Sequence, residues 1–557
     1  MKGATLILLA VLLLIVVVPI ATLTFGSFWS DSPVSPIGHL TLTNWSEAFN
    51  ITIPQTVPRL FLNSILFAFL VAFLSVLLGT TMAFLVERTD LPYGQFFENI
   101  AILPRGFPIL IAALAWIMLL SPKIGLLNLI LKQTLDLSPL NIYSFPGMVF
   151  LMVLYESPIV FLMVLNGLRL MDSSLEEQSL VCGNSVIGTL FRVTIPVMRP
   201  LMLSAFMLVF IISMITLEIP ILIGMPRGIF VFTSAIYQLI ATDYQSLAYY
   251  NIAAALAMML IPLTIVILLL YRRAVKHAES FVTVSGRIAS RRRYLLGGWR
   301  YLALISLALY FFLVIMLTAL VVVLISFSEF ITSPNLDMVT HLTLRHWRQA
   351  LLDPIVWRAL SNTLILSFTA ATVVVGFALA LGYVLVRSNA RFKAFLESLA
   401  MLPLAVPGTI LAIGFVWAYI RSPIYGTLWI LLLYFVGNYL PFALRTLIPF
   451  LFQLHSELEE ASWICGAGKA KTVVRIVIPF LRGGLFSVWI LLFQIYLREF
   501  AGAIILVSFG TEVLSSVLFL RAFGEGYLGI GAVLGVLMLA MSLVLHAIAA
   551  PRVKVLF

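Results

Sequence analysis

The chain has 557 residues, of which 62% are hydrophobic and only 10% are charged, and its mean hydropathy is +1.11. A water-soluble domain is about half apolar and about a quarter charged. This chain is too apolar to bury its surface in water, so we expect a polytopic membrane protein. The net charge of +11 then reflects Lys and Arg in cytoplasmic loops rather than nucleic-acid binding.

The residue types that catalysis and metal binding need are sparse. Two cysteines argue against a disulfide framework, and the six histidines form no ligand-like spacing. Residues 466–469 resemble the end of a phosphate-binding loop, but Trp463 and Ala470 stand where that motif needs Gly and Ser or Thr. We therefore expect no enzyme, no metal site and no cofactor or nucleotide site in this chain.

Apolar runs of about 20 residues, long enough to span a bilayer, recur along the sequence. The first follows Lys2 and is expected to be a retained helix rather than a signal peptide. An all-α integral membrane fold with about twelve spanning helices is predicted, six in each half, near 4–25, 60–86, 99–120, 145–168, 201–224, 249–271, 301–327, 361–386, 395–420, 425–449, 484–507 and 528–549.

The two halves repeat each other. Six helices per half give both halves the same orientation, so we expect two parallel six-helix repeats. The predicted divisions are residues 1–271, a basic linker at 272–300, and residues 301–557. The matching segments are His39-Leu40-Thr41-Leu42 with His341-Leu342-Thr343-Leu344, Trp45 with Trp347, Asn63-Ser64 with Asn362-Thr363, Arg88 with Arg387, and Leu103-Pro104 with Leu402-Pro403.

The distribution of Lys and Arg predicts the orientation. Residues 272–300 are strongly basic, whereas residues 26–58 contain no Lys or Arg. The linker and both termini are therefore expected in the cytoplasm, and residues 26–58 outside.

One polar segment occurs twice, 283 residues apart, between apolar runs. We name residues 172–200 the first repeated loop and residues 456–483 the second repeated loop. In the first, Asp172 and Ser173 can cap a short helix with Glu176 and Glu177 in its first turn. Gly183 is expected to turn the chain and Pro196 to mark the entry to the next span. The second copy offers Ser456, Glu459, Glu460, Ala461, Gly466, Arg475 and Pro479 at matching places.

The spacing Glu-Ala-Ala-x3-Gly-x9-Ile-x-Leu-Pro in both copies resembles the EAA motif of permease subunits of binding-protein-dependent ABC importers. The resemblance implies the type I ABC importer transmembrane fold, a bacterial inner-membrane location, and a coupling helix in each loop. It also implies two separate ABC ATPase subunits, which would bind ATP and Mg, and an external substrate-binding protein. The implied coupling-loop residues are Glu176, Glu177, Gly183, Pro196, Glu459, Glu460, Ala461, Gly466 and Pro479.

Within that family, residues 217–220 with 228–232, and 498–500 with 510–514, look most like the ferric-iron type. Thiamine, phosphonate and polyamine permeases are the alternatives. A secondary transporter is the alternative class, but it predicts more ionisable residues in the membrane than this sequence has.

Two acidic residues, Glu218 and Glu499, fall in or beside the fifth and eleventh predicted helices, at near-equivalent places in the two halves. Acids within a span are costly and usually functional, so we interpret them as possible pathway or gate residues. The alternative is that they mark helix ends in interfacial water, with Glu499 paired to Arg498. Asn63 and Asn362 are expected to make helix-packing hydrogen bonds.

Overall fold

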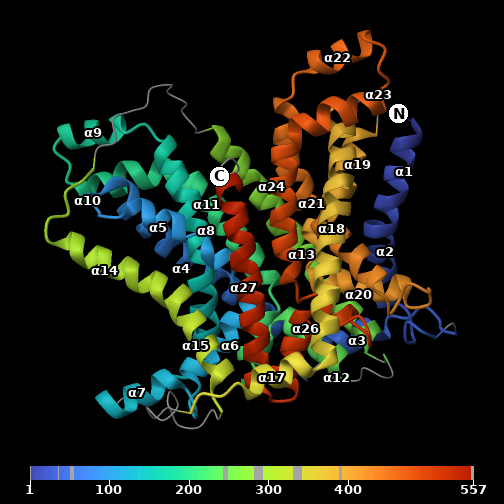
Figure 1. Cartoon of the computed structure of the whole chain (residues 1–557), viewed down its shortest axis with the longest axis horizontal. Coiled ribbons are helices and arrows are strands. Elements are labelled where there is room, and N and C mark those ends of the chain that lie inside the picture. Colours follow the sequence, from blue (N-terminus) through green and yellow to red (C-terminus); the bar gives the residue numbers. More distant parts are fainter. Residues whose placement is uncertain are drawn as a thin grey trace. The chain divides into compact units, whose positions relative to one another are not determined.

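The computed structural model describes residues 2–35, 37–50, 55–136, 138–242, 247, 249–280, 293–329, 341–387 and 392–553 (Figure 1). Three linker residues of the orientation argument, Arg287, Arg291 and Arg292, lie outside this part. The described residues form helices and loops with isolated β-bridges but no strand. Helices pair all but their terminal backbone polar groups within the segment, as a lipid environment requires.

The first half of the chain supplies the elements up to residue 280. They are α1 (Lys2–Leu12), η1 (Leu13–Val17), α2 (Val18–Ser27), α3 (Thr43–Phe49), α4 (Val57–Arg88), α5 (Gly94–Ile100), η2 (Leu103–Gly106), α6 (Ile109–Leu120), α7 (Leu126–Leu135), α8 (Phe145–Leu170), α9 (Ser174–Val181), α10 (Val186–Thr189), η3 (Leu190–Thr194), α11 (Ile195–Ile215), η4 (Pro220–Gly224), η5 (Met225–Arg227), α12 (Phe232–Thr242) and α13 (Tyr250–Ser280).

The second half supplies the remaining elements. They are α14 (Trp299–Phe311), η6 (Phe312–Leu317), α15 (Thr318–Phe327), α17 (Arg345–Leu352), α18 (Pro354–Arg387), α19 (Lys393–Met401), η7 (Leu402–Ala405), α20 (Gly408–Tyr419), α21 (Leu428–Gln453), α22 (Ser456–Ile464), α23 (Lys469–Thr472), η8 (Val473–Val477), α24 (Ile478–Leu497), α25 (Ala503–Leu506), α26 (Leu514–Phe519), η9 (Leu520–Gly524) and α27 (Leu528–Val553).

Ten helices of the described part are long and apolar enough to cross a membrane, or up to twelve if each of two sharply bent pairs counts as one span. This confirms the all-α membrane fold. The spans predicted at 201–224 and 484–507 are wrong at both ends. The structure has spans at Val186–Ile215 and Lys469–Leu497. The first is followed by a bent helix pair, Pro220–Arg227 with Phe232–Ala241, and the second by shorter helices that begin at Ala503 and Leu514.

A shared turn explains the shift of these two spans. A proline lacks the amide hydrogen that would close the helical ladder, and its ring crowds the carbonyl four residues earlier. The helix therefore widens into a π turn just before each proline, at η3 before Pro196 and at η8 before Pro479. The proline begins the α-helix, as predicted, but a continuous helical run reaches about ten residues further back.

The chain clusters into two compact units whose boundaries differ from those of the sequence halves. Unit 1 contains Met1–Asn50, Ile236–Ile261 and Trp347–Phe557, and unit 2 contains Ile51–Ala235 and Pro262–His346. Each unit thus joins most of one half to the opening helix of the other half. The predicted division of the chain into residues 1–271, 272–300 and 301–557 describes the two sequence repeats and their linker, and it stays a prediction.

The opening helix of the first half, residues 2–27, packs in unit 1, and we call it the exchanged helix of that unit. Close backbone contacts hold it there. A Cβ on Gly437 would lie 2.7 Å from the carbonyl oxygen of Ile15, and one on Gly414 would lie 2.5 Å from that of Pro19. Only glycine lets helix backbones approach so closely, which is how membrane helices gain packing energy. The exchanged helix therefore forms part of the core of unit 1.

The exchanged helix of unit 2 is the opening helix of the second half, residues 299–327, and hydrogen bonds hold it there. The Tyr155 hydroxyl on α8 lies 2.8 Å from the Thr318 hydroxyl, and the Tyr310 hydroxyl donates to the carbonyl of Leu154 at 2.6 Å. These side chains are buried, so the bonds are made away from water. The exchange is therefore reciprocal, and polar contacts occur in both units, since the Tyr419 hydroxyl donates to the Leu14 carbonyl at 2.7 Å in unit 1.

Within unit 1, the second repeated loop and α17 lie at opposite ends of α18, as Figure 1 shows with α22 and α23 at the top and α17 at the bottom.

The repeat predicted from His39 and His341 also has a structural counterpart. Thr41 donates its amide to Phe28 at 2.7 Å in unit 1, and Thr343 donates to Phe327 at 2.6 Å in unit 2.

Candidate functional site: the two repeated loops

Each repeated loop folds as a short helix, a glycine turn and a second helix that continues into a span. The turns are at Gly183 and Gly466, whose φ angles are +87° and +81°. The chain then bonds back to the preceding helix, from Asn184 to Ser179 at 3.1 Å and from Ala467 to Ser462 at 3.0 Å. The predicted glycine turns are confirmed, because a side chain is strained at such positive φ.

The two short helices begin differently. The carboxylate of Asp172 accepts the Ser174 amide at 2.9 Å, so this side chain caps α9. The N-cap residues themselves, Ser173 before α9 and His455 before α22, make no side-chain cap. Ser456 is already the first helical residue, so its expected capping role is wrong.

The first clamp, which we define as Arg88 with Glu176, fixes the first repeated loop to the ends of two spans. Arg88 Nε lies 2.9 Å from Glu176 Oε2, and Arg88 Nη2 donates to the Leu168 carbonyl at 2.8 Å. Thr194 donates its hydroxyl to the other carboxylate oxygen at 2.6 Å. One buried carboxylate thus ties the short helix to α4, the end of α8 and η3.

The second clamp, Arg387 with Glu459, repeats this geometry in unit 1. Arg387 Nε donates to Glu459 Oε1 at 2.8 Å, and Arg387 also donates to the carbonyl of Leu454 at the end of α21. The Tyr383 hydroxyl donates to the second carboxylate oxygen at 2.6 Å. The sequence repeat showed that Arg88 and Arg387 occupy equivalent positions. Only the structure shows that the partner of each arginine is a glutamate in a repeated loop.

The two adjacent glutamates of each repeated loop have different surroundings. Glu176 and Glu459 are 4% and 1% exposed, and each is paired with arginine. Glu460 is exposed and Glu177 is half-buried. A buried charge needs a partner, so the first glutamate of each pair shapes the loop and the second remains available to other molecules.

A hydroxyl pair explains why serine stands at the third position of each motif. The Ser179 hydroxyl lies 2.9 Å from that of Thr189, and the Ser462 hydroxyl lies 3.0 Å from that of Thr472. Each pair joins the short helix to the helix after the glycine turn. The alanine typical of the motif could not make this bond.

Exposed apolar side chains mark the same places on both loops. Val181 and Ile464, which end the short helices, are 85% and 86% exposed. Phe191 and Val474, near the start of the spans, are 63% and 62% exposed. The sequence analysis missed these residues, although each pair is also 283 positions apart. Exposed apolar groups that recur in this way indicate a contact surface.

Glu218 and Glu499 lie beyond the ends of α11 and α24 rather than inside them, and their contacts differ. Glu499 is 6% exposed and accepts the amides of Gly502 and Ala503 at 3.0 and 3.1 Å, and the Tyr434 hydroxyl at 3.1 Å. Glu218 is partly exposed and accepts bonds from Thr216 and Leu217. Glu499 thus stabilises the start of α25, and a pathway role for either acid stays a prediction.

Comparison with known proteins identifies the family. The family of binding-protein-dependent transport system inner membrane components matches residues 75–279 and again residues 372–554, together well over half of the chain. The chain belongs to this family. It is a multi-pass membrane permease with the family domain present twice, as the internal repeat predicted.

Relatives that match nearly the whole chain are named for ferric transport. The ferric transport system permease protein FbpB of Actinobacillus pleuropneumoniae is 27% identical over 97% of this chain and 77% of its own length. FbpB 1 of Haemophilus influenzae, whose name also refers to ferric transport, is 28% identical over 91% of this chain and 78% of its own.

Other matches cover less. The molybdate/tungstate permease WtpB of Methanocaldococcus jannaschii is 28% identical over 32% of this chain and 74% of its own length. A bacterial ABC transporter of known structure that imports alginate aligns with 46% of this chain and 95% of its own, at 15% identity and a TM-score of 0.38.

Proposed function

We propose that this chain is the membrane-spanning subunit of an ATP-driven importer of ferric iron. It would form the translocation pathway and couple to two separate ATPase subunits, which bind ATP and Mg, while carrying no cofactor itself. The ferric-transport relatives along 91–97% of the chain support the substrate. Thiamine, phosphonate and polyamine remain the alternatives to be tested.

The observation that carries the coupling role is the duplicated loop with matched exposed tips. Each loop is fixed to its unit by a buried arginine–glutamate clamp, yet it presents an apolar side chain that is about as exposed in one copy as in the other (85% and 86%). A rigid element with an exposed apolar tip is suited to dock into a groove of a soluble partner. Two copies accommodate two identical partners.

The proposed mechanism is alternating access. ATP binding would close the paired ATPases and move both repeated loops, and the clamps would pass the motion to the spans. The pathway would then open outward to an external binding protein that delivers iron, and hydrolysis would reset it inward. Both termini and both repeated loops would face the cytoplasm of a bacterial inner membrane, as the Lys and Arg distribution indicates.

Gentle purification of the tagged chain, with mass spectrometry of the copurifying proteins, tests the partners. We expect an ATPase with a phosphate-binding loop at about two copies per chain, and its loss in a Val181→Asp, Ile464→Asp double variant. The matched control is Ile37→Asp, whose residue is 82% exposed but lies outside both loops. Retention of the ATPase by the double variant would refute the docking role.

Transport assays test the coupling residues and the substrate. In proteoliposomes with the ATPase and binding protein, Glu460→Lys or Gly466→Pro should abolish uptake of labelled iron while the protein remains folded and inserted. Titration of the binding protein with ferric ion, thiamine and phosphonate should show tight binding of ferric ion alone. Uptake without any ATPase would instead indicate a secondary transporter.

A further inference from the structure

Two helices are the longest of the described part that contain no interior proline or π turn. α4 and α18 have 32 and 34 residues, and proline occurs only in their first turns. A proline or a π turn lies within many other spans of the described part, namely α8, α11, α13, α21, and the runs through η1 and η6, and such places are where helices kink. At about 1.5 Å per residue, α4 and α18 are roughly 48 and 51 Å long, so each is long enough to reach both membrane surfaces.

One end of each helix carries a clamp. Arg88 is the last residue of α4 and Arg387 the last of α18. Each binds the buried glutamate of a repeated loop, at 2.9 and 2.8 Å. The loop and its helix must therefore move together unless a buried ion pair is broken.

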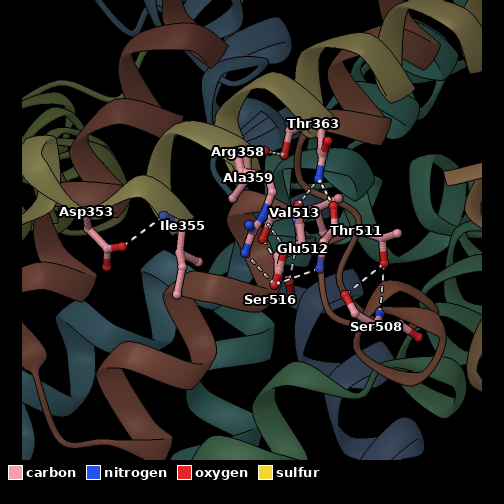
Figure 2. A network of polar contacts seen from close by, with 12 residues as sticks. Asp353, Ile355, Arg358, Ala359, Thr363, Ser508, Thr511, Glu512, Val513 and Ser516 are labelled. Atoms are coloured by element: carbon pink, nitrogen blue, oxygen red, sulfur yellow. Dashed lines mark hydrogen bonds and ion pairs between the residues drawn. The ribbon is translucent and has the colours of Figure 1, made fainter. Parts of the chain in front are cut away.

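The opposite end of α18 is fixed to a second loop, residues 507–513, which we name the second distal loop (Figure 2). Asn362 donates its amide group to the carbonyls of Gly510 and Glu512 at 3.1 and 3.0 Å. The Thr363 hydroxyl accepts the Leu514 amide at 2.8 Å. Arg358 adds a two-pronged ion pair with Glu512, at 2.9 and 3.1 Å.

The equivalent residues of α4 hold the first distal loop, residues 224–231, in the same way. Asn63 donates to the carbonyl of Phe230 at 2.9 Å, and the Ser64 hydroxyl accepts the Phe232 amide at 3.0 Å. The repeat of Asn63-Ser64 as Asn362-Thr363 is thus a repeated loop attachment. We name these four residues the distal attachments.

Both distal loops present exposed side chains at their tips. Phe509 is 88% exposed, and the Arg358 guanidinium lies 5.0 Å from its ring centroid. In the first distal loop Pro226 and Arg227 are exposed. These tips lie at the end of each long helix opposite its clamp, so a partner that touched them would act on the same helix as a partner docked on the repeated loop.

We propose that α4 and α18 are rigid struts that carry the signal of a docked external binding protein from the distal loops to the repeated loops. This inference rests on the proposed function. The distal attachments and the clamp arginines are positioning residues, since each fixes a loop to one end of an unbroken helix. Displacement of a distal loop then displaces the repeated loop on the other side of the membrane, without any residue along the path contacting substrate.

The test is ATP hydrolysis by the reconstituted complex of chain, ATPase and binding protein in nanodiscs. The Asn63→Ala, Asn362→Ala double variant should keep its basal hydrolysis within about twofold but lose at least about fivefold of the stimulation by the binding protein. Thr363→Val should show part of this loss. The matched control Thr363→Ser keeps the hydroxyl, as Ser64 does in the first half, and should behave as the native chain.

Full stimulation in the double variant would overturn the strut proposal. An absence of copurifying ATPase in the native complex would instead refute the proposed function, so the two failures are distinguishable. Basal hydrolysis also serves as the folding check, since a misfolded variant would lose it.

A distance measurement tests rigidity without disturbing the attachments. Spin labels at Trp357→Cys and Ala380→Cys, both at exposed positions of α18, are 23 residues apart and should be about 35 Å apart. The exposed Cys182 and Cys465 would first be changed to Ser. We expect the same distance with and without ATP, and a change of more than about 5 Å would overturn the proposal.

Discussion

The two clamps share their geometry but differ in burial. The side chains of Arg88 and Glu176 are 4% and 5% exposed, whereas those of Arg387 and Glu459 are 21% and 1% exposed. Both arginines also bind a carbonyl at the end of a neighbouring span. The difference shows that the pairing itself is the repeated feature, while the protein packed around it is free to vary.

The first clamp is also attached to the linker, which the chain contains only once. Tyr294 donates its amide to the Arg88 carbonyl at 2.7 Å and accepts the Asp90 amide at 3.0 Å. The Asp90 carboxylate accepts the Leu296 amide at 2.8 Å. In the second clamp, the additional contact comes from Tyr383 on α18, whose hydroxyl donates to the Glu459 carboxylate. The two repeated loops are therefore alike in shape but differ in how they are restrained.

The largest expected effect comes from removing the acid of the first clamp. Glu176→Ala leaves Arg88 buried without its charge partner, and we expect a loss of about 3–5 kcal/mol of stability. Glu459→Ala should cost about 1–3 kcal/mol, since Arg387 can turn toward water. Thermal unfolding of the detergent-solubilised chain measures both, with Glu177→Ala and Glu460→Ala as controls. An equal or larger loss for Glu459→Ala would show that burial does not distinguish the clamps.

Substitution of either loop tip should lower the affinity for the ATPase by the same factor, whereas the two clamp substitutions should differ in their effect on stability. Val181→Asp and Ile464→Asp each place a charge on a tip that is exposed to the same degree. We expect each change alone to weaken ATPase binding about tenfold, or about 1.4 kcal/mol. Titration of ATPase onto the immobilised chain gives the two affinities. A tenfold effect at one tip and none at the other would mean that only one loop docks.

Loss of the linker attachment should loosen the linker beside the first clamp and leave the second repeated loop unchanged. Asp90→Ala removes the acceptor of the Leu296 amide, at a cost of about 1 kcal/mol. Amide exchange should accelerate in residues 293–298, while peptides of the second repeated loop exchange at the native rate. Asp90→Asn, which keeps an acceptor oxygen, is the control. Unchanged exchange in residues 293–298 would show that the linker is held by other contacts.

The smallest expected effect is at the distal loops and depends on pH. Burial raises the pKa of the Glu512 carboxyl, but its bonds from Arg358 and the Gly510 amide outweigh that effect and leave the pKa lowered. A lowered pKa stabilises the fold above the ordinary value of about 4.3, and this contribution is lost as the pH falls through the lowered pKa. Exchange in the second distal loop should thus accelerate in acid. Glu512→Gln should abolish the pH dependence.

Much of the architecture could be predicted because it follows from composition and repetition. Apolar run length predicts spans, and matched spacing predicts equivalent glycine turns at Gly183 and Gly466. The spans after the repeated loops could not be delimited in this way. Polar residues before Pro196 and Pro479 resemble a loop, and only the π turn shows that the helix continues through them.

The candidate site was predicted in outline but not in its contacts. The repeats of Arg88 with Arg387 and of Asn63 with Asn362 were visible, yet a sequence repeat does not name a residue's partner. Glu176 and Glu177 are adjacent and chemically identical, so no sequence pattern assigns one to a buried clamp and the other to the surface. The exposed Val181 and Ile464 were missed because an apolar residue in an apolar chain carries little information.

The exchanged opening helices impose an order on biosynthesis. Ile15 contacts Gly437 in unit 1, a partner that leaves the ribosome 422 residues later. At about 5–20 residues per second, roughly 20–85 s pass between the synthesis of Ile15 and that of its partner Gly437. A chain whose synthesis stops before Gly437 therefore leaves the backbone of Ile15 without this contact, so the last-made half completes the packing of the first-made helix.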